Sequence, residues 1–173
     1  MMSGYYFTED VRRALAGARE EAYRLGHLYV GTEHIALGVL RTPSPVAASM
    51  LKSADQPALV AEIERRSVSG HNAASNAPDL PYTSGAKRIL GLAMHECQEL
   101  GHEAVDVEHL LLALLREEHG IAGQALRGAG LDLGAARIEV AGEGRRHSSA
   151  HHVSWLTRLL RRALKWAGRV PRG

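Results

Sequence analysis

Two histidines and a glutamate occur together twice in this sequence, at the same spacing. The two sets are His27, Glu33 and His34 and, 75 positions later, His102, Glu108 and His109. Imidazole nitrogens and carboxylate oxygens are ligands that Zn²⁺ accepts, so each set is a candidate metal site. Histidines beside helix ends usually hydrogen-bond to the backbone instead, and this interpretation is favoured for both sets. We therefore expect no metal.

Three further patterns are candidates for catalysis. The segment 95–99 begins like the His-Glu-x-x-His helix of zinc proteases but lacks the second histidine. Cys97 lies on the apolar stripe of a predicted helix, where a buried thiol is expected rather than a nucleophile. Gly128-Ala129-Gly130 follows a predicted helix, whereas a dinucleotide-binding loop follows a strand. The sequence thus predicts no catalytic residue, no cofactor and no enzyme.

The repeated residues belong to a longer duplication that keeps the same offset without a gap. Phe7-Thr8 returns as Tyr82-Thr83, Leu25-Gly26-His27 as Leu100-Gly101-His102, and Ile63-Glu64 as Ile138-Glu139. A duplication of this kind predicts one domain of two similar halves, with two related surface sites. Binding is therefore the first function to consider.

The elements that carry these residues are helices, because apolar residues recur at steps of three and four. Thr8 and Thr83 can cap the first helix of each half, and Gly26 and Gly101 can end it. Further helices are predicted at 32–41, 45–53 and from near Pro57, and at 107–117, 120–128 and from near Asp132. The predicted fold class is all-α: two four-helix halves related by a pseudo-twofold, joined by a linker at 71–81.

Composition limits where such a protein works. The 173 residues are 45% hydrophobic and 5% aromatic, which favours packed helices over a β-sandwich. A single cysteine excludes an internal disulfide framework and favours a reducing compartment. The N-terminus shows no secretion signal, and no apolar run approaches the roughly 20 residues of a spanning helix. We expect a cytoplasmic protein.

Charge divides the chain into an acidic body and a basic tail. Residues 144–173 hold eight of the 21 Arg and Lys and none of the 19 Asp and Glu. The body, 1–143, therefore has 13 basic and 19 acidic residues, a net charge of −6, against +8 for the tail. An acidic body argues against nucleic acid as a partner.

The tail has a pattern of its own. After a linker at 142–153, the segment 154–167 is predicted to form a basic amphipathic helix. The residues expected to interact are Trp155, Arg158, Arg161, Arg162, Lys165 and Trp166. Such a helix suits an anionic membrane surface, an apolar groove on a partner, or the acidic body of its own chain. A ninth helix that simply packs on the domain is the remaining alternative.

The duplicated segments resemble the N-terminal repeat domain of the Clp unfoldases, of the ClpC type. The segments are FTEDVRRALAGAREEAYRLGHLYVGTEHIALGVLR and YTSGAKRILGLAMHECQELGHEAVDVEHLLLALLRE. The likeness covers about 5–141, with repeat 1 at about 7–70 and repeat 2 at about 82–141. It implies a double four-helix repeat that recognises substrates or adaptors for an ATP-driven unfoldase and its peptidase.

The resemblance also implies a ligand, phosphoarginine, with a glutamate and nearby groups in each half. The matching residues are Thr8, Thr32, Glu33, Thr83 and Glu108. A carboxylate can pair with a guanidinium, and helix-start N–H groups and hydroxyls can receive a phosphate. The alternative is that both glutamates only complement a helix dipole. In the second half Asp106 takes the place of Gly31, and its negative charge disfavours a phosphate there. In the first half the segment Thr42-Pro43-Ser44-Pro45 alters one rim.

The sequence has no Gly-Lys pair and hence no phosphate-binding loop of an ATPase. We therefore expect a free-standing, non-catalytic protein-binding module: an adaptor, decoy or regulator in Clp-dependent proteolysis. Its expected partners are Clp ATPase or protease components or their substrates. The alternative is a scaffold tethered through its basic C-terminal helix to a partner or to a membrane surface, peripheral at the inner membrane face.

Overall fold

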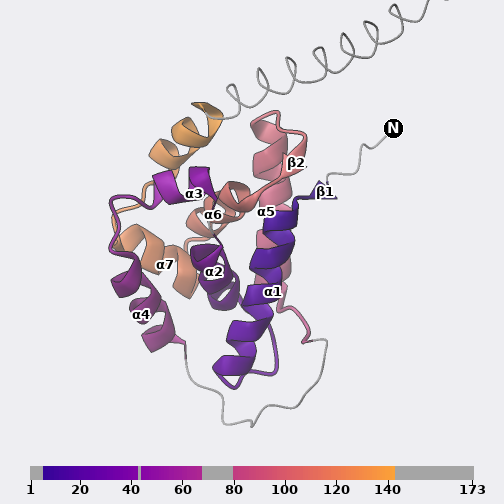
Figure 1. The fold of residues 1–173 in the computed structure, drawn as a ribbon, viewed down its shortest axis with the longest axis vertical. Helices are drawn as coiled ribbons and strands as arrows, with labels where there is room; N and C mark the ends of the chain where they lie inside the picture. The colour runs from indigo at the N-terminus through magenta and orange to yellow at the C-terminus, as the bar shows by residue number, and fades with distance from the viewer. Residues whose placement is uncertain (1–5, 43, 68–79, 143–173) are drawn as a thin grey trace, which may run out of the picture.

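Each half of the chain forms four helices, in the order that the sequence predicts (Figure 1). The structure, a computed structural model, describes residues 6–42, 44–67 and 80–142. The first half contains α1 (Glu9–Arg24), α2 (Thr32–Arg41), α3 (Pro45–Met50) and α4 (Gln56–Arg66). The second contains α5 (Ser84–Glu99), α6 (Val107–Arg116), α7 (Ile121–Gly128) and a helix that occupies 133–142. The all-α double repeat is confirmed.

The helix ends follow the expected capping residues. The hydroxyls of Thr8 and Thr83 accept hydrogen bonds from the amides of Val11 and Ala86, at 3.3 and 3.1 Å. Gly26 and Gly101, just after α1 and α5, have φ of 72° and 69°, a region that favours glycine.

Two predicted boundaries differ in the structure. The third helix ends at Met50, not at 53, because a turn is needed before Asp55, whose carboxylate caps α4 by accepting from the Ala58 amide at 3.1 Å. The last described helix includes residue 142, where the sequence placed the start of a linker. The predicted tail helix at 154–167 and its six interaction residues lie outside the described residues.

Short parallel strand pairings, which the sequence did not predict, join the two halves. Strand β1 (Tyr6–Phe7) pairs with β2 (Ala104–Val105), with Phe7 opposite Val105. A bridge between Val30 and Tyr82 repeats this pairing with the halves exchanged, because Tyr82 is the counterpart of Phe7 and Val30 that of Val105. The pairings therefore follow the pseudo-twofold, and each half supplies one side of each.

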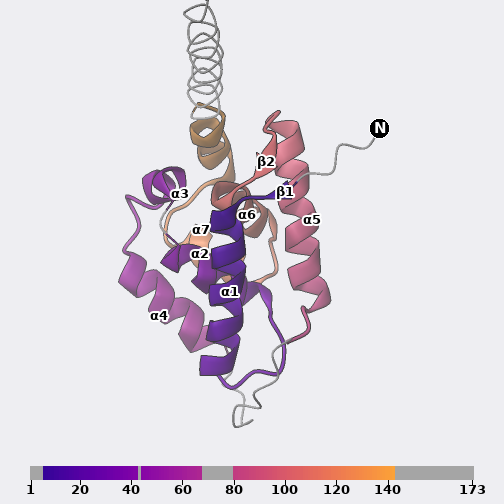
Figure 2. The same cartoon turned by 45° about the vertical axis from the view of Figure 1, so that its right-hand side comes forward.

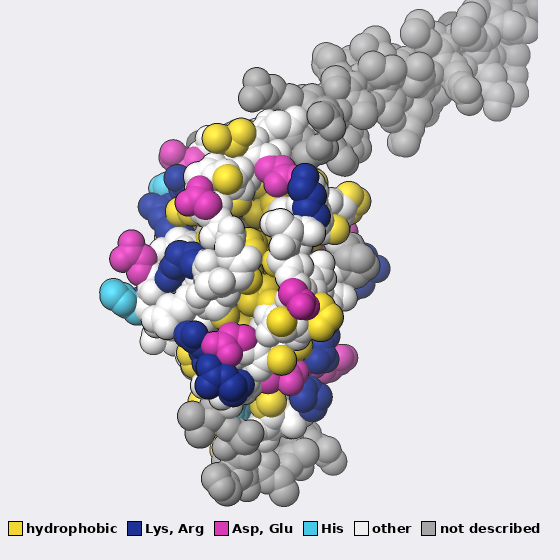
Figure 3. Space-filling view, turned by 90° about the vertical axis from the view of Figure 1, so that its left-hand side faces the viewer, with side chains coloured by type: hydrophobic (Ala, Val, Ile, Leu, Met, Phe, Trp, Pro, Cys, Tyr) yellow, Lys and Arg dark blue, Asp and Glu magenta, His cyan; other side chains and the backbone are white. Residues whose placement is uncertain are grey.

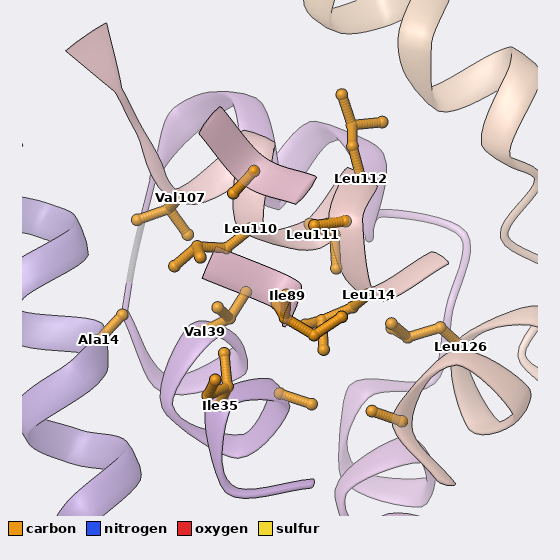
Figure 4. Close-up of a cluster of buried hydrophobic side chains, with 14 of the residues drawn as sticks. Ala14, Ile35, Val39, Ile89, Val107, Leu110, Leu111, Leu112, Leu114 and Leu126 are labelled. Atoms are coloured by element: carbon orange, nitrogen blue, oxygen red, sulfur yellow. The ribbon is translucent and has the colours of Figure 1, made fainter. Parts of the chain in front are cut away.

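Helices α2 and α6 form the centre of the domain (Figure 2). In α6 every residue from Val107 to Leu115 is buried, as expected of a helix that is apolar on all sides. Helices α1 and α5 cover one side of this pair, and α4 and α7 the other. Figure 4 shows the core that results, with Ile35 and Val39 of α2 beside Leu110 and Leu114 of α6.

Each half also buries one ion-paired glutamate at corresponding positions. Glu21 of α1 is 2% exposed and bonds to Arg24 and Arg41. Its counterpart Glu96 of α5 is fully buried and bonds to Arg116, the counterpart of Arg41, at 3.0 Å. The second partner of Glu96 is Arg137, whose Nε donates to Glu96 Oε2 at 2.8 Å and ties the helix at 133–142 to α5.

Candidate functional site

The first candidate glutamate, Glu33, lies in the first turn of α2. Its carboxylate folds back over the preceding Gly31, where a Cβ would stand only 2.3 Å from Glu33 Oε1. The Glu33 side chain is 13% exposed, and its Oε1 lies 3.5 Å from Nδ1 of the buried His34. Glycine at 31 therefore leaves the space that this carboxylate occupies.

The start of α5, from the other half, lies beside the start of α2. The Thr83 amide donates to the Val30 carbonyl at 3.0 Å, which fixes the two chain segments side by side. A Cβ on Gly85 would stand 3.5 Å from Thr32 Cγ2 and 3.8 Å from Thr83 Oγ1. We call Thr32, Glu33 and Thr83 the first site. It combines a carboxylate, two hydroxyls and two helix starts, whose first-turn N–H groups attract anions.

The second site consists of Thr8, Asp106 and Glu108, at the starts of α1 and α6. The Thr8 hydroxyl donates to Asp106 Oδ1 at 3.1 Å, and its amide donates to the Val105 carbonyl at 3.0 Å. The resemblance names both threonines and both glutamates. In the structure Thr83 lies beside the start of α2, which carries Glu33, and Thr8 lies beside the start of α6, which carries Glu108, because the strand pairings cross between the halves.

Glu108 is buried, whereas its counterpart Glu33 is half-buried. It is 9% exposed as a residue, and the Ser44 hydroxyl, from the first half, donates to its Oε2 at 3.3 Å. Burial, followed by the negative charges of Asp106 and Asp10, raises the pKa of Glu108 to about 7 against the lowering effect of the Ser44 hydrogen bond. A buried carboxyl that readily holds a proton is a poor partner for a guanidinium.

Ser44 is the residue that sequence reasoning missed. The sequence indicates that the segment 42–45 alters one rim in the first half, and in the structure its Ser44 contacts Glu108 of the second site. Its counterpart at the offset of 75 is His119, which is exposed. A cap on Glu108 could not be found from the pattern, because Ser44 and Glu108 are 64 positions apart and in different halves.

The paired histidines support the helix starts. His34 Nδ1 accepts from the Gly31 amide at 2.8 Å, so the neutral ring carries its proton on Nε2, which lies 2.8 Å from His27 Nδ1. His109 repeats this with Asp106 and His102, both at 2.9 Å. Burial and the neighbouring histidine lower the pKa of His34 to about 4, and the same two causes lower the pKa of His109 to about 4. The predicted backbone hydrogen bonds are confirmed for His34 and His109.

Metal binding at the first set would have to displace these bonds. Potential ligand atoms of His27, Glu33 and His34 lie within 4.8 Å of one another. Both nitrogens of His34, however, are already engaged, one by a backbone amide and one by His27.

Cys97 is buried, as predicted, and burial raises the pKa of its thiol to about 11. Such a thiol is a poor nucleophile.

The sequence matches the Clp repeat (R) N-terminal domain family over residues 6–129, and again over 82–169. The chain belongs to this family. A ClpA homologue from Guillardia theta, named as an ATP-binding subunit of the ATP-dependent Clp protease, is 40% identical over 134 residues. The chloroplastic chaperone protein ClpC1 from Arabidopsis thaliana is also 40% identical over 134 residues. These segments are 78% of this chain, but only 16% and 14% of the two relatives.

Solved structures share the fold. The Hsp104 N-terminal domain from Candida albicans superposes with a TM-score of 0.62 at 20% identity, covering 81% of this chain and 91% of that one. The N-terminal domain of the chaperone ClpD from Arabidopsis thaliana gives 0.54 at 21% identity, covering 79% and 96%. In Clp ATPases this domain is a binding module for substrates and adaptors. Within its described residues, this Clp repeat protein has no helix long and apolar enough to cross a membrane.

Proposed function

We propose that this Clp repeat domain is a non-catalytic protein-binding module in cytoplasmic Clp-dependent proteolysis, with the first site as its principal binding site. It acts as an adaptor, decoy or regulator that meets substrates or Clp components. The observation that carries this proposal is the difference between the two glutamates: Glu33 remains partly exposed beside two helix starts, whereas Glu108 is capped by Ser44.

The ligand class follows from the groups at the first site. A carboxylate accepts two hydrogen bonds from a guanidinium, and the Thr32 and Thr83 hydroxyls with the first-turn amides of α2 and α5 suit a phosphate. A phosphorylated arginine side chain carries both groups at adjoining positions. We therefore propose phosphoarginine on marked proteins as the ligand of the first site.

The second site is not proposed to bind this ligand. Asp106 places a carboxylate where the first site has Gly31, and like charges at short range oppose a phosphate. The Thr8 hydroxyl is already bonded to Asp106, and Glu108 to Ser44. The duplication thus leaves one site open and one closed.

A turnover assay tests the role. The full chain is added to a Clp ATPase with its peptidase and an arginine-phosphorylated substrate, and the rate of degradation is followed. An adaptor raises the rate and a decoy lowers it, and Glu33→Ala removes either effect. A rate that does not respond to the chain, together with a pull-down from source cells that recovers no Clp component, contradicts the proposal.

The second candidate function is a tethered scaffold that acts through the basic tail. It rests on the sequence of 144–173, which carries eight basic and no acidic residues and lies outside the described residues. Sedimentation of the full chain with anionic vesicles, and its absence with neutral vesicles, would support this function. Lack of sedimentation with both kinds of vesicle would exclude a scaffold tethered to a membrane surface.

A further inference from the structure

An apolar groove lies between α4 and α7, on the opposite side of the central helices from α1 and α5. Its cavity is about 510 Å³, and its floor consists of Ala58 and Leu59 of α4 with Ala125 and the adjoining Ala129. Figure 3 shows apolar side chains gathered along the middle of this face, with charged groups on either side. Small side chains on the floor allow a helix to approach closely.

The charged residues that line the groove are Asp55, Glu62 and Arg66. Glu62 is paired with Arg65 and Arg66, at 2.9 and 2.6 Å, so Asp55 is the acidic lining residue outside this ion-pair cluster. Arg66 also donates to Gln124 of α7 at 3.1 Å and so joins the two walls at one end. The groove is thus closed at that end by a polar contact, and its alanines and leucine supply the apolar part of its lining.

The occupant can be identified from the chain itself. Segment 154–167 has Trp155, Leu156, Leu159 and Leu160 at the spacing of one helix face, and four basic residues mostly opposite. An amphipathic segment of this kind suits an apolar groove. The tail carries +8 and the body −6, so attraction between them is also electrostatic. We propose that segment 154–167 docks in the α4–α7 groove of its own chain.

Covalent reach permits this docking. The ten residues of the helix at 133–142 span about 15 Å. The four links from Ala129 to residue 133 add at most about 15 Å, so residue 142 lies within about 30 Å of the groove. The 11 residues from 143 to 153 span up to about 36 Å when extended. The segment therefore reaches the groove without any change in the body, and its effective concentration there is high.

Tryptophan fluorescence of the full chain tests this proposal directly. The two tryptophans of the protein, Trp155 and Trp166, are both in the tail, so the signal reports the tail alone. Docking predicts an emission maximum at shorter wavelength than that of the denatured chain, and protection from acrylamide quenching. Both effects should be independent of protein concentration.

Three variants locate the docking site. Ala58→Arg, at an exposed position on the groove floor, and Ala129→Arg across from it should each abolish the blue shift and the protection. Ala61→Arg makes the same change at an exposed position on α4 outside the groove lining, and should leave both effects intact. Circular dichroism of each variant confirms that the body is folded.

Four outcomes would overturn the proposal. Tryptophans as accessible as in the denatured chain would show an undocked tail. A blue shift that survives both groove variants would place the tail elsewhere on the body. A shift that grows with protein concentration would indicate a second copy as the host. A shift that appears only with anionic vesicles would assign the tail to a membrane.

Discussion

The hydroxyl of Thr8, at the start of α1, donates a hydrogen bond to the carboxylate of Asp106, at the start of α6 in the other half, over 3.1 Å. The counterparts of these residues are Thr83 and Gly31, and glycine has no side chain to accept such a bond. The two sites of the duplicated domain therefore differ at this position, besides the replacement of Thr32 by Val107 and the contact of Ser44 with Glu108. In the second site the Thr8 hydroxyl is bonded to a carboxylate, whereas Gly31 offers the Thr83 hydroxyl no such acceptor.

Gly31→Asp should convert the first site toward the second. The new carboxylate displaces the Glu33 side chain, whose Oε1 would lie 2.3 Å from the added Cβ. Two like charges about 5 Å apart repel by about 3 kcal/mol at an effective dielectric near 20, so phosphoarginine affinity should fall at least about tenfold. Aspartate is a good N-cap, so the melting temperature should be kept. Gly31→Asn, of equal size and no charge, is the matched control: an equal loss in both variants would show that shape, not charge, decides.

Glu108→Gln should change how stability depends on pH. The pKa of Glu108 is about 7 in the folded chain because of burial and the nearby charge of Asp106, and near 4.5 when unfolded. The folded state thus holds this proton more tightly, and its contribution to stability is lost as pH rises from 4.5 through 7. The free energy of unfolding of the variant, relative to the wild type, should rise by about 3 kcal/mol over that range. Urea unfolding at several pH values measures this; parallel curves would contradict it.

His34 and His109 should drive acid destabilisation. Their pKa values of about 4 lie below the ordinary value of 6.5, first because of burial and then because of His27 and His102. The stability that comes from these neutral rings is present above pH 6.5 and is lost as pH falls through 4. NMR titration of the imidazole rings should find two that stay neutral at pH 5, with the proton on Nε2. Protonation of all ten histidines near pH 6.5 would contradict the hydrogen-bonded pairs.

Arg137→Ala should weaken the attachment of the last described helix. Arg137 donates two hydrogen bonds to the fully buried Glu96. Burial raises the pKa of Glu96, but the bonds and charges of Arg137 and Arg116 outweigh burial and lower it. Loss of hydrogen bonds to a charged group costs about 2 kcal/mol. Urea unfolding and amide exchange at 133–142 measure the effect. Arg65→Ala, which removes an exposed pair with Glu62, should have little effect, and equal losses in both variants would contradict this role of Arg137.

Much of this fold could be predicted from the sequence because the duplication keeps one offset. Thr83 could be placed from Thr8, and Gly101 from Gly26. The recurrence of apolar residues at steps of three and four predicted the helices between them. The strands could not be predicted, since Phe7 and Val105 pair over only two residues and across 98 positions. Segments so short carry no alternating pattern.

The candidate site was predictable in its residues but not in their grouping. Glu33 and Glu108 occupy equal positions in the duplication, and Asp106 indicated that the second site differs. That Thr83 accompanies Glu33 depends on the exchange of pairings between the halves. That Ser44 covers Glu108 depends on a loop of one half that reaches the other. Contacts of this kind follow from packing and leave no periodic trace.

One open and one closed site predict a single binding event, which calorimetric titration of phosphoarginine into the full chain measures. The wild type should bind one equivalent, more tightly than arginine or phosphate alone. Glu33→Ala should abolish the heat of binding, whereas Glu108→Gln, which keeps an acceptor for Ser44, should leave it unchanged. Two equivalents per chain, binding that survives Glu33→Ala, or no binding by the folded protein would contradict the account.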